Sequence, residues 1–362
     1  MAKPPQWIKP TDKDDDSHPL QGFVVLLVAP FLSYEGIQAL RATSTSLRDI
    51  LDRYERSIAL EHFARHWYEV QPRHLILSSE TPTRYVIAFP SYAAIREFEG
   101  RARTIHYLIH HTSYLSEGYS CAGLGQDCTP EEMAYITQGL ERALWLCSHI
   151  ADLEAASWSS LDDVPESRRL DQHIVGDRCH ECEEASDATT AGEKLPAQNP
   201  VRAAQLEIIK SLPTVDLARL VVLLFLVRHG LMGFLIDEGR DDDVELHICQ
   251  AWCTSAAEAT LRHGAFFLHS QIQGGNKCLL DAAEVTCPVA RRVAELVSEL
   301  VEEIHQWERG DSDMLPGLNM TVQGTFRKRV GCDVEHSLHF AAQLVSGQDV
   351  KCDHCKKVIA SA

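Results

Sequence analysis

The chain has 362 residues, of which 45% are hydrophobic, so it can bury one large core or two modest ones. Its 34 basic and 52 acidic side chains give a formal net charge of −18. Because nucleic acids and anionic membrane surfaces bind concentrated positive charge, this balance argues against both as partners. The first residues lack the apolar core of a signal peptide, so we expect an intracellular protein of the cytoplasm or nucleus. Its twelve cysteines should then stay reduced.

The N-terminal part of the chain divides at residue 20. Residues 1–19 are rich in proline, lysine and aspartate, which predicts a disordered tail. Residues 20–65 predict a module of three short helices, with Pro30 ending the first. The predicted helices cover residues 20–32, 34–44 and 46–65. The first is apolar nearly all the way round, so we expect it to be covered on more than one side, by its own domain and by a foreign protein.

Residues 66–158 are predicted to form a helical lobe. Short strands are indicated at 73–79 and 84–89, and a helix over 96–115. A longer helix should begin at Pro130, because Thr129 can cap it and two glutamates follow in its first turn. Its expected buried face consists of Met133, Ile136, Leu140, Leu144 and Cys147.

Residues 159–199 are polar, acidic and poor in aromatic residues, which predicts a linker or surface excursion. A second helical lobe should follow over 200–330. Its most apolar helix, 215–236, is interrupted by two arginines and a histidine, which favours a buried helix over a membrane span. Further helices are predicted over 201–212 and 287–310. The predicted fold is therefore mainly α, a short three-helix module followed by a larger helical region in two lobes.

The C-terminal segment, residues 331–362, carries a candidate zinc site. A C-x2-C pair lets two thiolates bind one tetrahedral ion, and an upstream C-x3-H pair would share one face of a helical turn. The four expected ligands are Cys332, His336, Cys352 and Cys355. His354 or His339 could replace the histidine, and nearby lysines should lower the thiol pKa values. The alternative is that the C-x2-C is incidental.

Two further patterns have the spacing of metal ligands. A second C-x2-C lies in the acidic linker, and its best candidate partners lie upstream. These residues are Cys179 and Cys182, with Cys121 and Cys128. His106 and His110 have the i, i+4 spacing of a helical metal pair but lack the Glu of H-E-x-x-H, so we predict a partly buried helix face rather than protease chemistry.

Residues 20–48 resemble the F-box, in the loosely matching form common in large fungal families. That family pattern has a leading Leu-Pro, an apolar first helix, a Leu-Ser turn, and a second helix ending in Arg, with an aromatic residue or Leu before a later Arg. The matching residues are Leu20, Val24, Val25, Val28, Phe31, Leu32, Ser33, Ile37, Leu40, Arg41, Leu47 and Arg48. The chain departs from the pattern at Gln21, where the family has Pro, and at Phe23, where Glu is usual.

The resemblance implies docking on the Skp adaptor of a cullin-RING ubiquitin ligase. The implied partner-binding residues are Leu20, Val24, Val25, Val28, Phe31, Leu32, Ile37, Leu40 and Leu47. The helical region would present a client protein, and other subunits would transfer ubiquitin. We find no known catalytic motif and expect no catalytic residue. The alternatives are a helical interaction protein without a ligase link, stabilised or not by zinc, and a cysteine- or metal-dependent enzyme.

Overall fold

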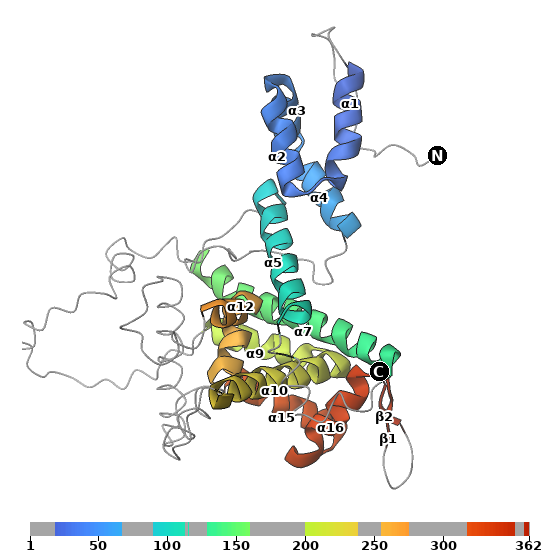
Figure 1. The fold of residues 1–362 in the computed structure, drawn as a ribbon, viewed down its shortest axis with the longest axis vertical. Coiled ribbons are helices and arrows are strands. Elements are labelled where there is room, and N and C mark those ends of the chain that lie inside the picture. The colour runs from blue at the N-terminus through green and yellow to red at the C-terminus, as the bar shows by residue number, and fades with distance from the viewer. Residues whose placement is uncertain are drawn as a thin grey trace, which may run out of the picture.

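The computed structural model describes residues 19–66, 90–112, 115, 129–159, 200–237, 255–274, 317–351 and 358–361. Within these residues the protein is mainly α-helical, as predicted, with one two-stranded sheet near the C-terminus. A small group of N-terminal helices projects from a larger helical group (Figure 1). We call these two parts the N-terminal module and the helical body.

The N-terminal module, residues 19–66, is a chain of short helices joined by tight turns. Its elements are α1 (Pro19–Val28), the 3-10 turn η1 (Ala29–Phe31), α2 (Tyr34–Thr43), α3 (Thr45–Arg53) and α4 (Glu55–His66). Two serines start helices: Ser33 accepts the N–H of Gly36 at 3.2 Å, and Ser44 accepts the N–H of Leu47 at 3.1 Å. A capping serine needs only one residue between helices, which is why α2 and α3 follow each other so closely.

The prediction of a single third helix over 46–65 was wrong, because the chain turns at Tyr54 and forms α3 and α4 instead. Tyr92 holds this turn from outside. Its hydroxyl donates to the Leu51 carbonyl at 2.8 Å, and its backbone N–H donates to the Glu55 carboxylate at 2.7 Å. The last carbonyls of a helix have no partner within the helix, so this hydroxyl stabilises the end of α3.

The helical body contains the longer helices and the sheet. Its elements are α7 (Pro130–Ser159), α9 (Pro200–Ser211), α10 (Thr214–Asp237), helical residues 255–263, α12 (Ala265–Gly274), α15 (Leu318–Val330), α16 (Val334–Val345), β1 (Val350–Lys351) and β2 (Val358–Ala360). The strands pair antiparallel. The predicted start of α7 is confirmed: Thr129 and Glu132 exchange hydrogen bonds of 2.8 and 3.2 Å in a capping box. Its predicted face is also confirmed, with Met133 half-buried and the other four residues buried.

The described side chains of helix α10, residues 214–230, are mostly buried, as predicted for the helix over 215–236. Its fully or nearly covered side chains include Leu217, Ala218, Leu220, Val221, Val222, Leu223, Leu224, Leu226 and Val227. Helices α7, α15 and α16 pack around it. In the part of the chain that the structure describes, no helix has both the length and the apolar character needed to cross a membrane.

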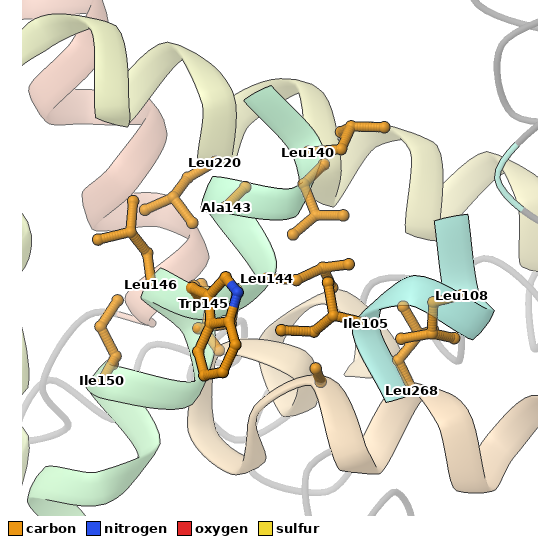
Figure 2. Packing of buried hydrophobic residues seen from close by; sticks show 14 of the residues in the cluster. Ile105, Leu108, Leu140, Ala143, Leu144, Trp145, Leu146, Ile150, Leu220 and Leu268 are labelled. Carbon is orange, nitrogen blue, oxygen red and sulfur yellow. The ribbon is translucent and has the colours of Figure 1, made fainter. Parts of the chain in front are cut away.

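Helix α5 (Tyr92–His110) joins the module to the body (Figure 1). At its module end, the Glu99 carboxylate accepts the N–H of Tyr34, the first residue of α2, at 3.1 Å. At its body end, Ile105 lies beside Leu144 of α7, and Leu108 lies beside Leu268 of α12 (Figure 2). A single continuous helix therefore packs into both parts.

Two buried charge clusters hold helices together, one between α5 and the body and one within the body. Arg101 of α5 makes two hydrogen bonds to the Asp152 carboxylate of α7, at 2.8 and 2.9 Å, and one to Glu97. Glu258 accepts hydrogen bonds from two arginines and from two backbone N–H groups that begin α15. Its donors are Arg202, Arg262, Leu318 and Asn319. Although burial raises the pKa of Glu258, these cations and N–H groups outweigh it and leave that pKa below its usual value.

Helices from both predicted lobes share one core. Helix α7 packs against α9, α10 and α16, and the buried apolar side chains form one cluster that reaches from the module to Val350. The division into two lobes is therefore not confirmed. Several predicted features lie outside the described residues: the tail before Pro19, the strands over 73–79 and 84–89, the linker beyond Ser159 and the helix over 287–310.

Candidate partner-binding surface

Exposed large apolar side chains concentrate on the N-terminal module. Six of the ten found in the described residues lie there: Phe23, Val24, Leu27, Val28, Phe31 and Leu60. The other four are spread over separate elements of the body: Tyr135, Met320, Val334 and Val358. Single exposed apolar residues are normal on any protein surface, whereas a cluster of them marks a contact site.

Helix α1 has two apolar faces. With 100° per residue in an α-helix, positions 23, 24, 27 and 28 fall within an arc of about 140°, and Phe31 follows them in η1. We call this exposed set the α1 face; Val24 is 54% exposed and Phe31 59% exposed. Leu26 and Ala29 lie on the opposite side of the helix and are buried. One apolar side of α1 is therefore covered by the module, and the other is uncovered in the isolated chain.

A packed layer supports the α1 face from inside. The buried side chains of the module include Leu26, Ala29, Pro30, Ile37, Leu51, Ile58, Ala59 and Phe63. Helix α4 packs on η1, and the Arg65 guanidinium lies 4.2 Å from the centre of the Phe31 ring. Glu61 binds Arg65 at 2.6 Å. The cation over the ring orients Phe31, the most exposed member of the face.

The α1 face carries no charge. No charged residue lies between Pro19 and Tyr34, and in residues 19–66 as a whole five arginines balance five carboxylates. The module is therefore neutral in a chain whose net charge is −18. Since the cores of protein interfaces are depleted of charged residues, a partner can cover the α1 part of this face without desolvating an ion. At Phe31 the face is bordered by the ion pair of Arg65 and Glu61.

The structure separates the predicted partner-binding residues into three groups. Val24, Val28 and Phe31 are exposed; Val25, Leu32, Leu40 and Leu47 are half-buried; Ile37 is fully buried and supports the module from inside. Leu20 lies in α1, and its side chain is outside the described ones. Phe23 and Leu27 were missed. Their spacing to Phe31 follows the helical period, so that pattern alone would have found them.

Aromatic and polar contacts connect the module firmly to α5 and the body. Phe63 of α4, Phe98 of α5 and Trp145 of α7 form a row, with ring centroids 5.0 and 5.8 Å apart. The buried His62 ring lies 3.8 Å from the Glu99 carboxylate. Burial raises the pKa of Glu99, although its bond from the Tyr34 N–H acts in the opposite direction. The α1 face is therefore held in a fixed place relative to the body.

The candidate zinc ligands are only partly within the described residues. Gly331, in the left-handed conformation, ends α15, and Asp333 caps α16 by accepting the N–H of His336 at 2.9 Å. Cys332 therefore lies in the turn before α16, so the prediction that Cys332 and His336 share one helical turn was wrong. Burial raises the pKa of Cys332, the opposite of the effect expected from nearby lysines.

The remaining predicted cysteine ligands fall outside the residues that the structure describes: Cys121, Cys128, Cys179, Cys182, Cys352 and Cys355. Among the described side chains, no group of three or more His, Cys, Asp or Glu residues is arranged to hold a metal ion. In sequence, the C-x2-C near the C-terminus lies between the paired strands β1 and β2. Zinc binding there stays a prediction.

The residues of α1 to α3 that carry the resemblance to the F-box thus fold into consecutive short helices with an uncovered apolar face. No family model, no curated protein and no solved structure matches the chain.

Proposed function

We propose that the protein is an F-box-type adaptor. Its N-terminal module would dock on a Skp-type adaptor of a cullin-RING ubiquitin ligase through the α1 face. The helical body would present a client protein, and ubiquitin transfer would be carried out by other subunits. In this proposal the chain contributes binding surfaces and no catalytic residue.

The concentration of exposed apolar side chains on the α1 face carries the proposal. A helix that is apolar on all sides belongs in a protein interior, and α1 is covered by its own chain on one side only. The uncharged character of the face favours a protein partner that contributes apolar side chains. The order of short helices and the residues that match the F-box pattern favour a Skp-type adaptor over an unrelated partner.

The way α5 is held supports the second half of the proposal. A substrate receptor must keep its client at a set place relative to the ligase. Helix α5 is bonded to α2 through Glu99, to α3 and α4 through Tyr92, and to α7 through Arg101. A client on the body would therefore be carried at a constant orientation relative to the docking face.

Binding of the full chain to a purified Skp-type adaptor tests the proposal. We expect a stable complex on gel filtration and a measurable Kd by calorimetry. Val24→Asp should weaken binding more than about 100-fold, because a carboxylate in an apolar interface loses its water without gaining a partner. Val334→Asp is the matched control: it makes the same change at a side chain that is 64% exposed on α16.

Two outcomes would contradict the proposal. One is that the wild-type chain, folded and monodisperse, forms no complex with the adaptor. The other is that Val24→Asp and Val334→Asp bind equally well, which would place the contact away from the α1 face. Binding of the adaptor that is lost only in Val334→Asp would assign docking to the body instead.

A further inference from the structure

Three histidines gather at the C-terminal end of α5, away from the α1 face. His106, His110 and His111 are all exposed. The ring centroids of His106 and His110 are 4.5 Å apart, and those of His106 and His111 are 5.6 Å apart. The sequence pattern predicted a partly buried face here. The exposure of these rings instead leaves them open to a ligand from solvent.

The separation of His106 and His110 fits a shared metal ion. Two imidazoles bound at about 2.1 Å from one ion have centroids roughly 4.5 to 5.5 Å apart, from right-angled to tetrahedral coordination. The observed 4.5 Å lies at the right-angled end of this range. Right angles are the preference of octahedral and tetragonal ions such as Ni²⁺ and Cu²⁺, which also bind imidazole more strongly than most divalent ions.

The surroundings favour a cation. His110 is in the last turn of α5 and His111 follows it as the cap, so both lie at the negative end of the helix dipole. The nearest cation along the helix, Arg103, is paired with Glu35 at 3.3 Å. On the α12 side, Tyr107 meets the ring of His269, and burial lowers the pKa of His269, which disfavours a positive charge on this neighbour.

We propose that His106 and His110 form a surface site for a divalent transition-metal ion in right-angled coordination. The protein supplies two neighbouring ligands and water supplies the others. The site is separate from the docking face and from the predicted zinc cysteines.

Calorimetric titration of the untagged full-length chain with Ni²⁺ tests this site. The titration is done in a background in which Cys179, Cys182, Cys352 and Cys355 are all replaced by serine, so that neither C-x2-C pair contributes thiolates. We expect one Ni²⁺ per chain and at least a tenfold loss of affinity in His106→Ala/His110→Ala. The control His229→Ala removes a half-buried histidine of α10 that belongs to no predicted metal site, and it should bind Ni²⁺ like the parent.

The thermal midpoint provides a second readout. Both histidines are exposed, so the double variant should unfold at the same temperature as the parent without metal. Added Ni²⁺ should raise the midpoint of the parent and leave that of the double variant unchanged, because a ligand stabilises the state that binds it. Equal affinity in the parent and the double variant, or an equal loss of affinity in His229→Ala, would overturn the site.

Discussion

Helices α1 and α10 have similar apolar composition and opposite surroundings. Both are largely apolar, and the sequence predicts that both should be covered. Helix α10 is enclosed by α7, α15 and α16, whereas α1 is packed on one side and leaves five apolar side chains uncovered. The chain thus completes the environment of α10 by itself. For α1, we propose that another molecule supplies the missing cover.

The comparison also extends to charge. Buried ionised groups are paired around Glu258 in the body and around Arg101 where α5 meets it, whereas the arginine–carboxylate pairs of the module lie nearer the surface. A buried ion pair fixes the relative orientation of the helices that carry it, but loss of either partner leaves an uncompensated buried charge. The body is therefore sensitive to single changes, and the α1 face should tolerate them in the free chain.

The largest expected contrast comes from placing the same charge in each helix. Leu223 of α10 is fully buried, so Leu223→Asp should destabilise the chain by more than about 5 kcal/mol and prevent folding. Val24→Asp should change the free energy of unfolding of the free chain by less than about 0.5 kcal/mol. Urea unfolding measures both. If Val24→Asp unfolds the free chain, α1 is a core helix and its exposed face is not a docking surface.

Glu258 and Glu35 provide the same contrast for charge. Glu258→Gln should cost about 3–5 kcal/mol, because Arg202 and Arg262 lose a buried partner and α15 loses its cap. Glu35→Gln removes an exposed pair with Arg103 and should cost less than about 0.5 kcal/mol. Thermal and urea unfolding at neutral pH compare the two variants.

The pKa of Glu258 determines how the stability difference between the wild type and Glu258→Gln changes with pH. The pKa of Glu258 in the folded chain lies below its ordinary value of 4.5, so its contribution is fully present above that pH. It is lost as the pH falls through the folded pKa. The stability difference between the wild type and Glu258→Gln should therefore shrink below about pH 4.5. A difference that stays constant in acid would show that the carboxylate's charge is not what stabilises the body.

Close helix packing in the body predicts a smaller effect. A Cβ added to Gly139 of α7 would lie 2.8 Å from a methyl group of Val345 of α16, so Gly139→Ala should cost about 1–3 kcal/mol. A Cβ added to Gly324 of α15 would meet no atom within 4 Å. Gly324→Ala should stabilise the chain by about 0.5–1 kcal/mol through its helix propensity. Equal effects on the unfolding midpoint would contradict this account of the α7–α16 contact.

The smallest expected effect on stability concerns the predicted zinc. Helix α16 already packs on α10 and α7, so metal at Cys352 and Cys355 would stabilise only the chain end. We expect one zinc per chain in metal analysis, lost in Cys352→Ser/Cys355→Ser, with an unchanged melting temperature of the body. Equal zinc in both proteins, or none in the wild type, would remove the site.

Patterns within one helix were predictable from the sequence. The start of α7 at Thr129, the face that includes Leu140 and Leu144, and the burial of α10 all follow from local rules on caps and periodicity. The mainly α character follows from the same rules. In α1, the spacing of the apolar residues also indicated that they lie nearly all the way round the helix, which led to the expectation that this helix is covered on more than one side.

Features that depend on distant contacts were not predictable. The turn at Tyr54 lies within continuous helical spacing and is held by Tyr92, far along the chain. The cap of α15 comes from Glu258 on another helix. Ile37 matched a family position, but its burial is decided by how α2 folds against its neighbours. Phe23 and Leu27 were passed over because the family pattern, rather than the helical period, selected the residues.

Hydrogen–deuterium exchange of the full chain, with and without a saturating Skp-type adaptor, tests most directly that the α1 face is a docking surface. Peptides covering α1, η1 and α4 should exchange more slowly in the complex. Peptides covering residues 217–227 of α10, which the chain already covers, should not change. Protection confined to the body, with α1 exchanging at the same rate in both samples, would contradict the account.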